Sequence, residues 1–401
     1  MQYKIYPHWD MLSIILYVLM GYLGAFAIKK GSKKPYTVVK RNARTISINS
    51  LYVIWWFLWS FVAAFRLINS NGIGGTDAWT YINYFKICNG GSSNIADTIL
   101  YYAEHYEVLW KLFNKFVRIF TDNYHVLFAI VYGFIVWTYQ KTINSFSYDR
   151  IYAAPFICLF FLYLRGFNTL RTELSGAFIL LMVIALKKEN YKKAIILGIV
   201  SVGIQISSAL YCLFIPFHYL FKKGRLKTST VVILLILAIV VGRGAQVVLT
   251  GSIGKSLGHM YFSYAAHNLG KSFLDNYWKI AFGQILIGVL ILLFDKKLKS
   301  KVSPEMGIAD SVQFVREVCL FDVITIPVTF ILDIWRGYEY LYIMRLLMWS
   351  YVTYVFLKGK SSSFRHIVAV IEVLVFTAWL VFRINHTWES SGYLPYVVSI
   401  F

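Results

Sequence analysis

The chain has 401 residues, of which 58% are hydrophobic and only 15% are charged. Soluble globular chains are about half apolar and about a quarter charged, so an ordinary soluble domain is excluded. The formal net charge is +21, but most of the lysines stand in short loops between long apolar runs. That arrangement is typical of a membrane protein rather than of a nucleic-acid groove, so we predict no nucleic-acid partner.

The apolar runs are long enough to cross a hydrocarbon core of about 30 Å, and they recur along the whole chain. We predict an all-α polytopic membrane protein with about twelve transmembrane helices in a single domain, 1–401. The predicted spans are 11–28, 46–65, 124–139, 151–164, 172–187, 193–205, 207–221, 229–248, 277–294, 313–333, 340–357 and 366–383. The apolar run 193–221 could instead form one long tilted helix, but two helices keep the lysines at both of its ends on one side of the membrane.

Basic residues mark every second loop, starting with the stretch 29–44. The other basic loops lie near 141–150, 187–193, 222–227, 296–301 and 358–365. Loops rich in Lys and Arg stay in the cytoplasm, so we predict that both termini lie outside. The two long segments 66–123 and 249–276 then belong to the outer side.

An amphipathic stretch at 105–120 lies within the first outer segment. Its apolar residues recur at three- and four-residue spacing from Val108 to Phe120, whereas Lys111 and Arg118 take another face. We predict a helix that lies flat on the outer membrane surface or on the helix bundle.

Arginines are predicted at outer helix ends or in outer turns, where lysine would be enough to set the topology. They are Arg66, Arg165, Arg171, Arg243, Arg336, Arg345 and Arg383. A guanidinium presents a planar fork of donors that suits phosphate, and several in one cavity would bind a lipid-linked pyrophosphate. The alternative is that single arginines reach up to lipid headgroups.

The sequence contains no Walker loop, no dinucleotide fingerprint and no DxD motif in a cytoplasmic loop. It also shows no His, Asp or Glu group with metal-ligand spacing, so we predict no metal and no cofactor. Any chemistry is then expected on the outer side, with a substrate that is already activated on a lipid.

A family resemblance is carried by three stretches. They run AAFRLINSNGIGGTDAWTYINYF at 63–85, HYEVLWKLFNKFVRIFTDNYHVLF at 105–128, and a segment at 165–214 that opens RGFNTLRTELSG. Together they resemble the EpsG-like family of bacterial polysaccharide polymerases, within the broader Wzy class. The positions that match the family motifs are Arg66, Gly75, Thr76, Asp77, Tyr81, Glu107, Asn168 and Arg171. Gln205 stands where the family has a histidine.

The resemblance implies a fold related to C-type glycosyltransferases and a metal-independent polymerase in the bacterial cytoplasmic (inner) membrane. Such an enzyme would join oligosaccharide repeat units on the outer membrane face, with donor and acceptor both carried on undecaprenyl pyrophosphate. The product could be an O-antigen, a capsule or an exopolysaccharide. Membrane lipids would surround the enzyme, and a flippase and a chain-length regulator are its expected partners.

Within this function, we expect Arg66, Arg165 and Arg171 to hold the donor pyrophosphate, with Arg336 and Arg345 as second-choice members. The candidates for the catalytic base, in order of preference, are Asp77, Glu107 and Glu173. Glu173 could instead form a simple ion pair with Arg171. The expected sugar contacts are Tyr81, Tyr84, Asn168 and Gln205.

The preference for Asp77 comes from its local pattern. The glycines at 74–75 allow a tight turn, and Thr76 is expected to cap a short helix that follows. Asp77, Tyr81 and Tyr84 then share one face, where a carboxylate could orient or deprotonate a sugar hydroxyl beside two aromatic rings. The alternative is that Asp77 only stabilises the N-terminus of that helix.

Two other functions remain open from the sequence. A flippase for lipid-linked oligosaccharides would also have about a dozen helices, although such transporters usually show two related halves and short outer loops. Another membrane glycosyltransferase with a polyprenyl-phosphate donor would share an acidic motif in the first outer segment, which Asp77 partly satisfies.

Overall fold

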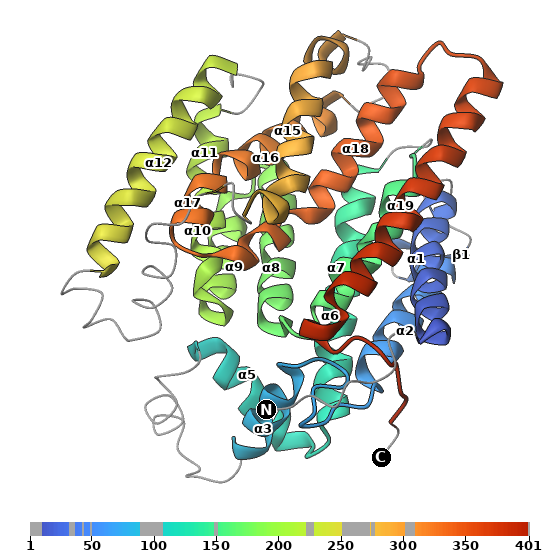
Figure 1. Cartoon of the computed structure of the whole chain (residues 1–401), viewed down its shortest axis with the longest axis vertical. Coiled ribbons are helices and arrows are strands. Elements are labelled where there is room, and N and C mark those ends of the chain that lie inside the picture. The colour runs from blue at the N-terminus through green and yellow to red at the C-terminus, as the bar shows by residue number, and fades with distance from the viewer. Residues whose placement is uncertain are drawn as a thin grey trace. The chain divides into compact units, whose positions relative to one another are not determined.

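The computed structural model describes residues 10–31, 37–41, 44–48, 50–88, 107–147, 151–221, 228–250, 273, 277–300 and 309–399. The chain forms two compact units, a division that the sequence did not indicate. The first unit is Met1–Ala177 with Phe356–Phe401, and the second is Phe178–Val355. Figure 1 shows that the described parts of both units are built almost entirely from helices.

The first unit joins the N-terminal part of the chain to its last helix. Its elements are α1 (Met11–Gly31), β1 (Thr37–Arg41), β2 (Arg44–Ile48), α2 (Ser50–Ala64), α3 (Ala78–Ile87), α5 (Val108–Phe120), α6 (Tyr124–Phe146), η1 (Ala154–Cys158), α7 (Leu159–Arg165), the start of α8 (Leu170–Lys187) and α19 (Ser362–Ser391). The strands form an antiparallel hairpin that begins in the predicted basic loop 29–44, and this hairpin is the departure from the all-α prediction within the described residues.

The core of the first unit is aromatic. Trp55 and Trp59 of α2 are fully buried, and the ring of Trp59 packs edge-on against Phe160 with 4.8 Å between ring centroids. Gly24 of α1 lets that helix come close, because a Cβ at this position would stand 3.0 Å from the Trp59 ring. The hydrophobic effect and close packing together therefore hold α1, α2 and α7 in one body.

The C-terminal segment 392–399 lies against the loop that follows α2. Leu67 N–H donates to the carbonyl of Val397 at 2.7 Å, and Gly74 N–H donates to the carbonyl of Gly392 at 3.0 Å. Backbone hydrogen bonds of this kind satisfy groups that would otherwise be buried without partners. The loop that precedes α3 is therefore held by the far end of the chain.

The start of α1 meets the same segment. The hydroxyl of Tyr17 donates to the carbonyl of Tyr393 at 2.7 Å, and Tyr396 N–H donates to Ser13 Oγ at 2.8 Å. The start of α1, the loop after α2 and the C-terminal segment thus share one end of the first unit. The predicted topology requires this arrangement; that the shared side is the outer one stays a prediction.

The second unit contains the remainder of α8 and the helices that follow it. They are α9 (Tyr191–Ile204), η2 (Ile206–Ser208), α10 (Ala209–Cys212), α11 (Phe214–Phe221), α12 (Thr228–Thr250), α15 (Tyr277–Ser300), α16 (Ala309–Ile324), α17 (Ile326–Ile331), η4 (Trp335–Glu339) and α18 (Tyr342–Leu357). The predicted division of the run 193–221 is confirmed, because α9 ends at Gln205, whose backbone is extended. The predicted span 313–333 is also divided, at Thr325, just before Pro327 in the first turn of α17.

Charged residues of α16 are paired with side chains from α15, α11 and α18. The pairs are Arg316 with Asp295 at 2.8 Å, Glu317 with His218 at 3.1 Å, and Asp322 with Arg345 at 3.1 Å. Charges inside membrane helices are tolerated when they are paired in this way. Helix α16 therefore makes polar contacts with three neighbouring helices of the second unit.

Five helices in the described residues are long and apolar enough to cross a membrane. They are α1, α6, α12, α15 and α19. Shorter apolar helices lie at Ser50–Ala64, Ala154–Arg165, Ile206–Phe221 and Tyr342–Leu357. A membrane protein is thereby supported, whereas the count of about twelve spans and the relation to C-type glycosyltransferases stay predictions.

Candidate functional site

The tight turn predicted at 74–75 is present in the structure. Gly74 and Gly75 have φ of +79° and +121°, a region that residues with a Cβ rarely adopt. A Cβ on Gly74 would lie 2.0 Å from the carbonyl oxygen of Leu67, and one on Gly75 would lie 2.6 Å from that of Phe167. Only glycine fits at both positions, so the loop after α2 can pass directly over the start of α8.

The predicted cap of the following helix was wrong by one residue. Helix α3 begins at Ala78, and its N-cap is Asp77, whose side chain makes no capping hydrogen bond. Thr76 does not cap the helix because its hydroxyl instead donates to Asn168 Oδ1 at 3.2 Å. The carboxylate of Asp77 therefore makes no N-capping hydrogen bond to the backbone of α3.

Asn168 connects this turn to the start of α8. Its Oδ1 accepts hydrogen bonds from the Thr76 hydroxyl and from Asp77 N–H, each at 3.2 Å. Its backbone carbonyl accepts from the hydroxyl of Tyr81 at 3.3 Å. Asn168 was predicted to contact sugar; in this structure its side-chain oxygen holds the backbone of Asp77.

Arg171, in the first turn of α8, forms an ion pair with Glu107, the N-cap of α5. The side chains are 11% and 14% exposed, so the pair is partly open to solvent. Two residues predicted separately, one for pyrophosphate and one as a base, are therefore in direct contact. We call Asp77, Glu107, Asn168 and Arg171 the Asp77–Arg171 cluster, since Asn168 lies three residues before Arg171 and touches Asp77.

Arg66 occupies a closed site beneath the turn. Its Nε donates to the carbonyl of Gly74 at 2.6 Å and its Nη1 donates to that of Ala63. The guanidinium lies over the ring of Phe167 at 4.0 Å and over that of Phe128 at 4.8 Å, and the residue is 1% exposed. The arrangement does not support the predicted contact of Arg66 with pyrophosphate, because its donors face backbone inside the protein; it supports a role in holding the turn.

Glu173 is also enclosed. It is 4% exposed, and its Oε2 accepts a hydrogen bond from the hydroxyl of Tyr139 on α6 at 2.7 Å. Arg171 pairs with Glu107, and the alternative of a local ion pair between Glu173 and Arg171 stays a prediction. Tyr139 was missed from the sequence because nothing in its apolar run marks it as a partner of a residue on α8.

The two tyrosines predicted to stack on sugar are buried. Tyr81 is 4% and Tyr84 is 5% exposed, and the Tyr81 ring packs edge-on against Trp110 of α5 with 5.8 Å between ring centroids. In this arrangement the rings join α3 to α5, and a sugar would reach them only if these side chains moved. Arg165, in the last turn of α7, is partly exposed.

The predicted surface helix is present as α5, which begins at Val108. Part of its apolar side is exposed, with Phe116 59% exposed and Phe120 72% exposed. Lys111, expected on an outward polar face, is instead buried together with Trp110. Exposed aromatic side chains on one side of α5 suit a helix that rests at the membrane surface.

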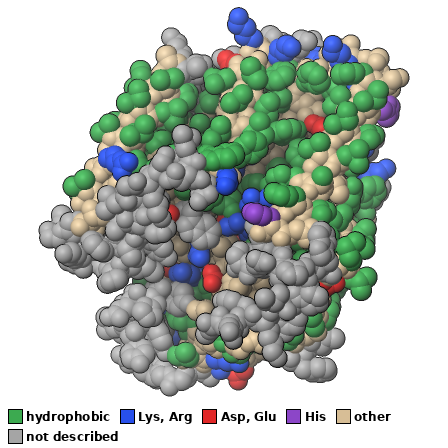
Figure 2. Space-filling model, in the orientation of Figure 1, with side chains coloured by type: hydrophobic (Ala, Val, Ile, Leu, Met, Phe, Trp, Pro, Cys, Tyr) green, Lys and Arg blue, Asp and Glu red, His purple; other side chains and the backbone are tan. Residues whose placement is uncertain are grey.

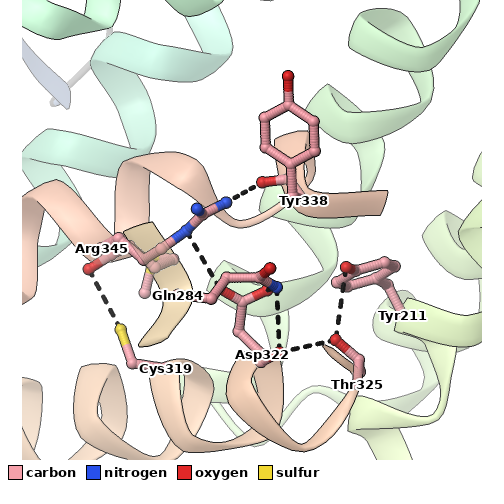
Figure 3. Close-up of polar contacts among 8 residues, drawn as sticks. Tyr211, Gln284, Cys319, Asp322, Thr325, Tyr338 and Arg345 are labelled. Atoms are coloured by element: carbon pink, nitrogen blue, oxygen red, sulfur yellow. Dashed lines mark hydrogen bonds and ion pairs between the residues drawn. The ribbon is translucent and has the colours of Figure 1, made fainter. Parts of the chain in front are cut away.

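In the second unit, the predicted candidate Arg345 is the centre of a buried polar group (Figure 3). Its Nε lies 3.1 Å from Asp322 Oδ2, and its Nη2 donates to the backbone carbonyl of Tyr338 in η4. Gln284 Nε2 donates to Asp322 Oδ1 at 2.8 Å. Arg345 is 4% exposed, so it is buried beneath the surface, where its hydrogen bond to Tyr338 stabilises the turn at 333–340.

Asp322 was not among the candidate residues predicted from the sequence, although a carboxylate inside a predicted span indicates a buried partner. The other candidates of the second unit stand apart from this group. Arg336, in η4, is partly exposed. Gln205 ends α9, and its Oε1 is buried without a hydrogen-bond partner among the described residues.

Within the described part of the chain, no group of three or more His, Cys, Asp or Glu side chains is placed to hold a metal ion. His105, His259 and His267 lie outside the described residues, as does most of the predicted outer segment 249–276. His386 is exposed near the end of α19, where it stacks on Phe382.

The long apolar helices, together with a group of carboxylates and an arginine in the first unit, indicate a helical membrane protein with a polar candidate site. Residues 49–398 match the model of the EpsG family, and the chain belongs to that family. The resemblance seen in the short motifs is thereby confirmed. The family is associated with glycosyltransferase-like polysaccharide polymerases of membranes. No curated protein and no solved structure matches the chain at a significant level.

Proposed function

We propose that the protein joins oligosaccharide repeat units, each carried on undecaprenyl pyrophosphate, on the outer face of the bacterial cytoplasmic membrane. The Asp77–Arg171 cluster is the observation that supports this proposal most strongly. It unites two carboxylates, an arginine and an amide, drawn from three separate segments of a chain in the EpsG family. A flippase would deliver the units, and a chain-length regulator would limit the product.

The reaction requires one base and one site for a leaving anion. A hydroxyl at the non-reducing end of the acceptor attacks the anomeric carbon of the donor sugar, and its proton passes to a carboxylate. The bond between that carbon and the pyrophosphate oxygen breaks, so undecaprenyl pyrophosphate leaves with the bonding electron pair. Positive charge fixed near that oxygen lowers the barrier because negative charge grows there in the transition state.

Arg171 is placed for the second task. It lies in the first turn of α8, where the helix dipole adds positive potential. A guanidinium carries five N–H donors in a planar fork, so an ion pair through Nη1 is compatible with further contacts to phosphate. Glu107 orients this fork and balances its charge while the substrate is absent.

Asp77 remains our preferred base, and the structure supplies a reason to rank the three carboxylates. Glu107 is already paired with Arg171, and Glu173 is enclosed beside Tyr139. Asp77 is partly exposed, and its backbone N–H donates to Asn168 Oδ1. A base must meet the hydroxyl from which it takes a proton, so partial exposure favours Asp77.

The direct test uses purified protein and a lipid-linked repeat unit, with products separated on a gel. We expect a ladder of polymers in the wild type, and loss of the ladder in Arg171→Ala and Asp77→Asn. Arg171→Lys should also be impaired because it keeps the charge but loses the fork. Arg365→Lys, at an exposed position near the start of α19, is the matched control and should polymerise normally.

Three results would redirect the proposal. Normal ladders from both Arg171 variants would remove Arg171 from the pyrophosphate site, and a normal ladder from well-folded Asp77→Asn would make Glu107 the base. We expect a chelator to leave polymerisation unchanged. Activity lost in chelator and restored by magnesium would instead indicate a metal-dependent transferase.

The outer location is tested separately by labelling single cysteines in intact cells. Asn71, in the loop after α2, and Ser361, just before α19, are both exposed. A membrane-impermeant thiol reagent should label Asn71→Cys and not Ser361→Cys. The reverse pattern would invert the predicted topology.

A further inference from the structure

Helix α12 presents an arginine on a face that is otherwise apolar and exposed. The helix is long and apolar enough to cross a membrane, and Figure 2 shows many hydrophobic side chains along the part of it that faces the viewer. Val240 and Val247 are 62% and 71% exposed, and Arg243 stands exposed between them. Residues three and four apart share a helix face, so the guanidinium belongs to the surface that faces lipid.

The guanidinium of Arg243 is fixed in position by a hydrogen bond. Arg243 Nη1 donates to Gln246 Oε1 at 2.8 Å. Gln246 is 2% exposed, and its Nε2 donates to the backbone carbonyl of Ile331 at 3.1 Å. Gly242 lies against the same residue, since a Cβ there would stand 2.9 Å from the Ile331 side chain. The arginine is thus fixed through a buried glutamine to the packed side of α12.

A notch lies beside this arginine. Gly244 is exposed, and the position of its missing Cβ has no atom within 4 Å among the described residues. Val240, Gly244 and Val248 are four residues apart and form one strip along the helix. The strip is apolar, with the missing side chain of Gly244 at its centre and the guanidinium of Arg243 beside it.

Arg243 stands about two turns from the end of α12. Arg243 lies seven residues before Thr250, the end of α12, which is about 10 Å along a helix. That end is predicted to be the outer one, and Gln246 draws the guanidinium toward it. An arginine at this depth in hydrocarbon is expected to pair with an anion at the lipid surface.

We propose that this strip is a docking site for the polyprenyl pyrophosphate of the lipid-linked substrate, with phosphate on Arg243 and the isoprenoid chain over Gly244. The inference rests on the proposed function for the identity of the lipid. A single slender chain fits a strip whose centre is one missing side chain, and the pyrophosphate carries more charge than the phosphate of a phospholipid. The site would collect substrate from the bilayer before transfer.

The test is a binding measurement that needs no turnover. Full-length protein in phosphatidylcholine nanodiscs is labelled with a photoreactive polyprenyl pyrophosphate, and the labelled peptides are identified by mass spectrometry. We expect labelling within 240–248, reduced about tenfold in Arg243→Gln, as for loss of a hydrogen bond to a charged group. Gly244→Leu fills the notch at an exposed position and should reduce labelling as well.

Matched controls separate the site from general effects. Arg365→Gln removes the same charge elsewhere, and Ser229→Leu adds the same bulk at an exposed position in the first turn of α12; both should label normally. Unlabelled undecaprenyl pyrophosphate should compete, and phosphatidylglycerol should not. Equal competition by phosphatidylglycerol, or unchanged labelling in both test variants, would overturn the proposal.

The outcome is distinguishable from a failure of the proposed function. Arg171→Ala is expected to lose polymerisation and to keep labelling on α12. A wild-type protein that labels α12 but makes no polymer would refute the polymerase and leave the lipid site standing.

Discussion

Replacing Asn168 by alanine should weaken catalysis without removing any charged group. The substitution deletes the Oδ1 that accepts from the Thr76 hydroxyl and from Asp77 N–H. The contact from the Tyr81 hydroxyl goes to the backbone carbonyl of Asn168 and is therefore retained. The variant thus isolates the link between the Asp77 turn and the start of α8.

The size of the effect follows from those two hydrogen bonds. Each neutral bond contributes about 0.5–1.5 kcal/mol net, and at 3.2 Å both are at the long end of the range, so about 1–2 kcal/mol is at stake. If that energy holds Asp77 in its reactive position, the polymerisation rate should fall about fivefold to thirtyfold, since about 1.4 kcal/mol corresponds to a factor of ten. Asn168→Asp keeps the acceptor but places a second negative charge near Asp77, so it should raise the pH at which activity appears.

The assay is the initial rate of polymer formation, measured beside thermal unfolding in detergent. Asn144→Ala is the matched control, because Asn144 Oδ1 accepts from the Tyr52 hydroxyl at 2.7 Å elsewhere in the first unit. It should lower stability by a similar amount and leave the rate per folded molecule unchanged. A wild-type rate for Asn168→Ala, or an equal loss in the control, would refute the positioning role of Asn168.

Three further predictions concern the supporting structure. Gly392→Ala should lower the thermal unfolding temperature of the first unit and lower activity, because the backbone has φ of +64° and the new Cβ would lie 1.8 Å from a backbone oxygen. Gly359→Ala is the control: it also has a positive φ, +83°, but its Cβ would meet open space, so thermal unfolding should show only the smaller strain of that φ. Asp322→Ala should lower stability by about 3–5 kcal/mol, since it leaves Arg345 as a buried unpaired charge, and adding Arg345→Met should restore much of the loss in chemical denaturation. Burial raises the pKa of the Cys88 thiol, so maleimide should label Cys88 slowly at pH 8 in folded protein and rapidly after denaturation, as measured by mass spectrometry; equal rates would contradict its burial.

Some candidate residues change their role once the structure is considered. Arg66 and Arg345 were both expected to face pyrophosphate, yet each donates to backbone carbonyls and is nearly inaccessible. Guanidinium groups are well suited to binding backbone carbonyls because several N–H donors lie in one plane. Arg171 pairs with the partly exposed carboxylate of Glu107, and the proposed chemistry therefore rests on Arg171.

The membrane class and the approximate positions of many helices could be predicted from the sequence alone. Long apolar runs, lysine-rich loops and a pair of glycines are local patterns, and local patterns decide where a helix crosses or a turn forms. The division of 193–221 and the turn at 74–75 were both confirmed for this reason. The family could also be predicted from the sequence, because each of its motifs is a short run of neighbouring residues.

Only the tertiary structure decided which of these residues meet. Asn168 and Asp77 are 91 positions apart and Arg171 and Glu107 are 64 apart, so their contacts depend on how whole segments pack. The burial of Lys111 has the same origin: hydrophobic periodicity identifies the apolar face of α5, but not which face the rest of the unit covers. Side-chain partners over such separations are set by packing and charge pairing in three dimensions, which no local spacing records.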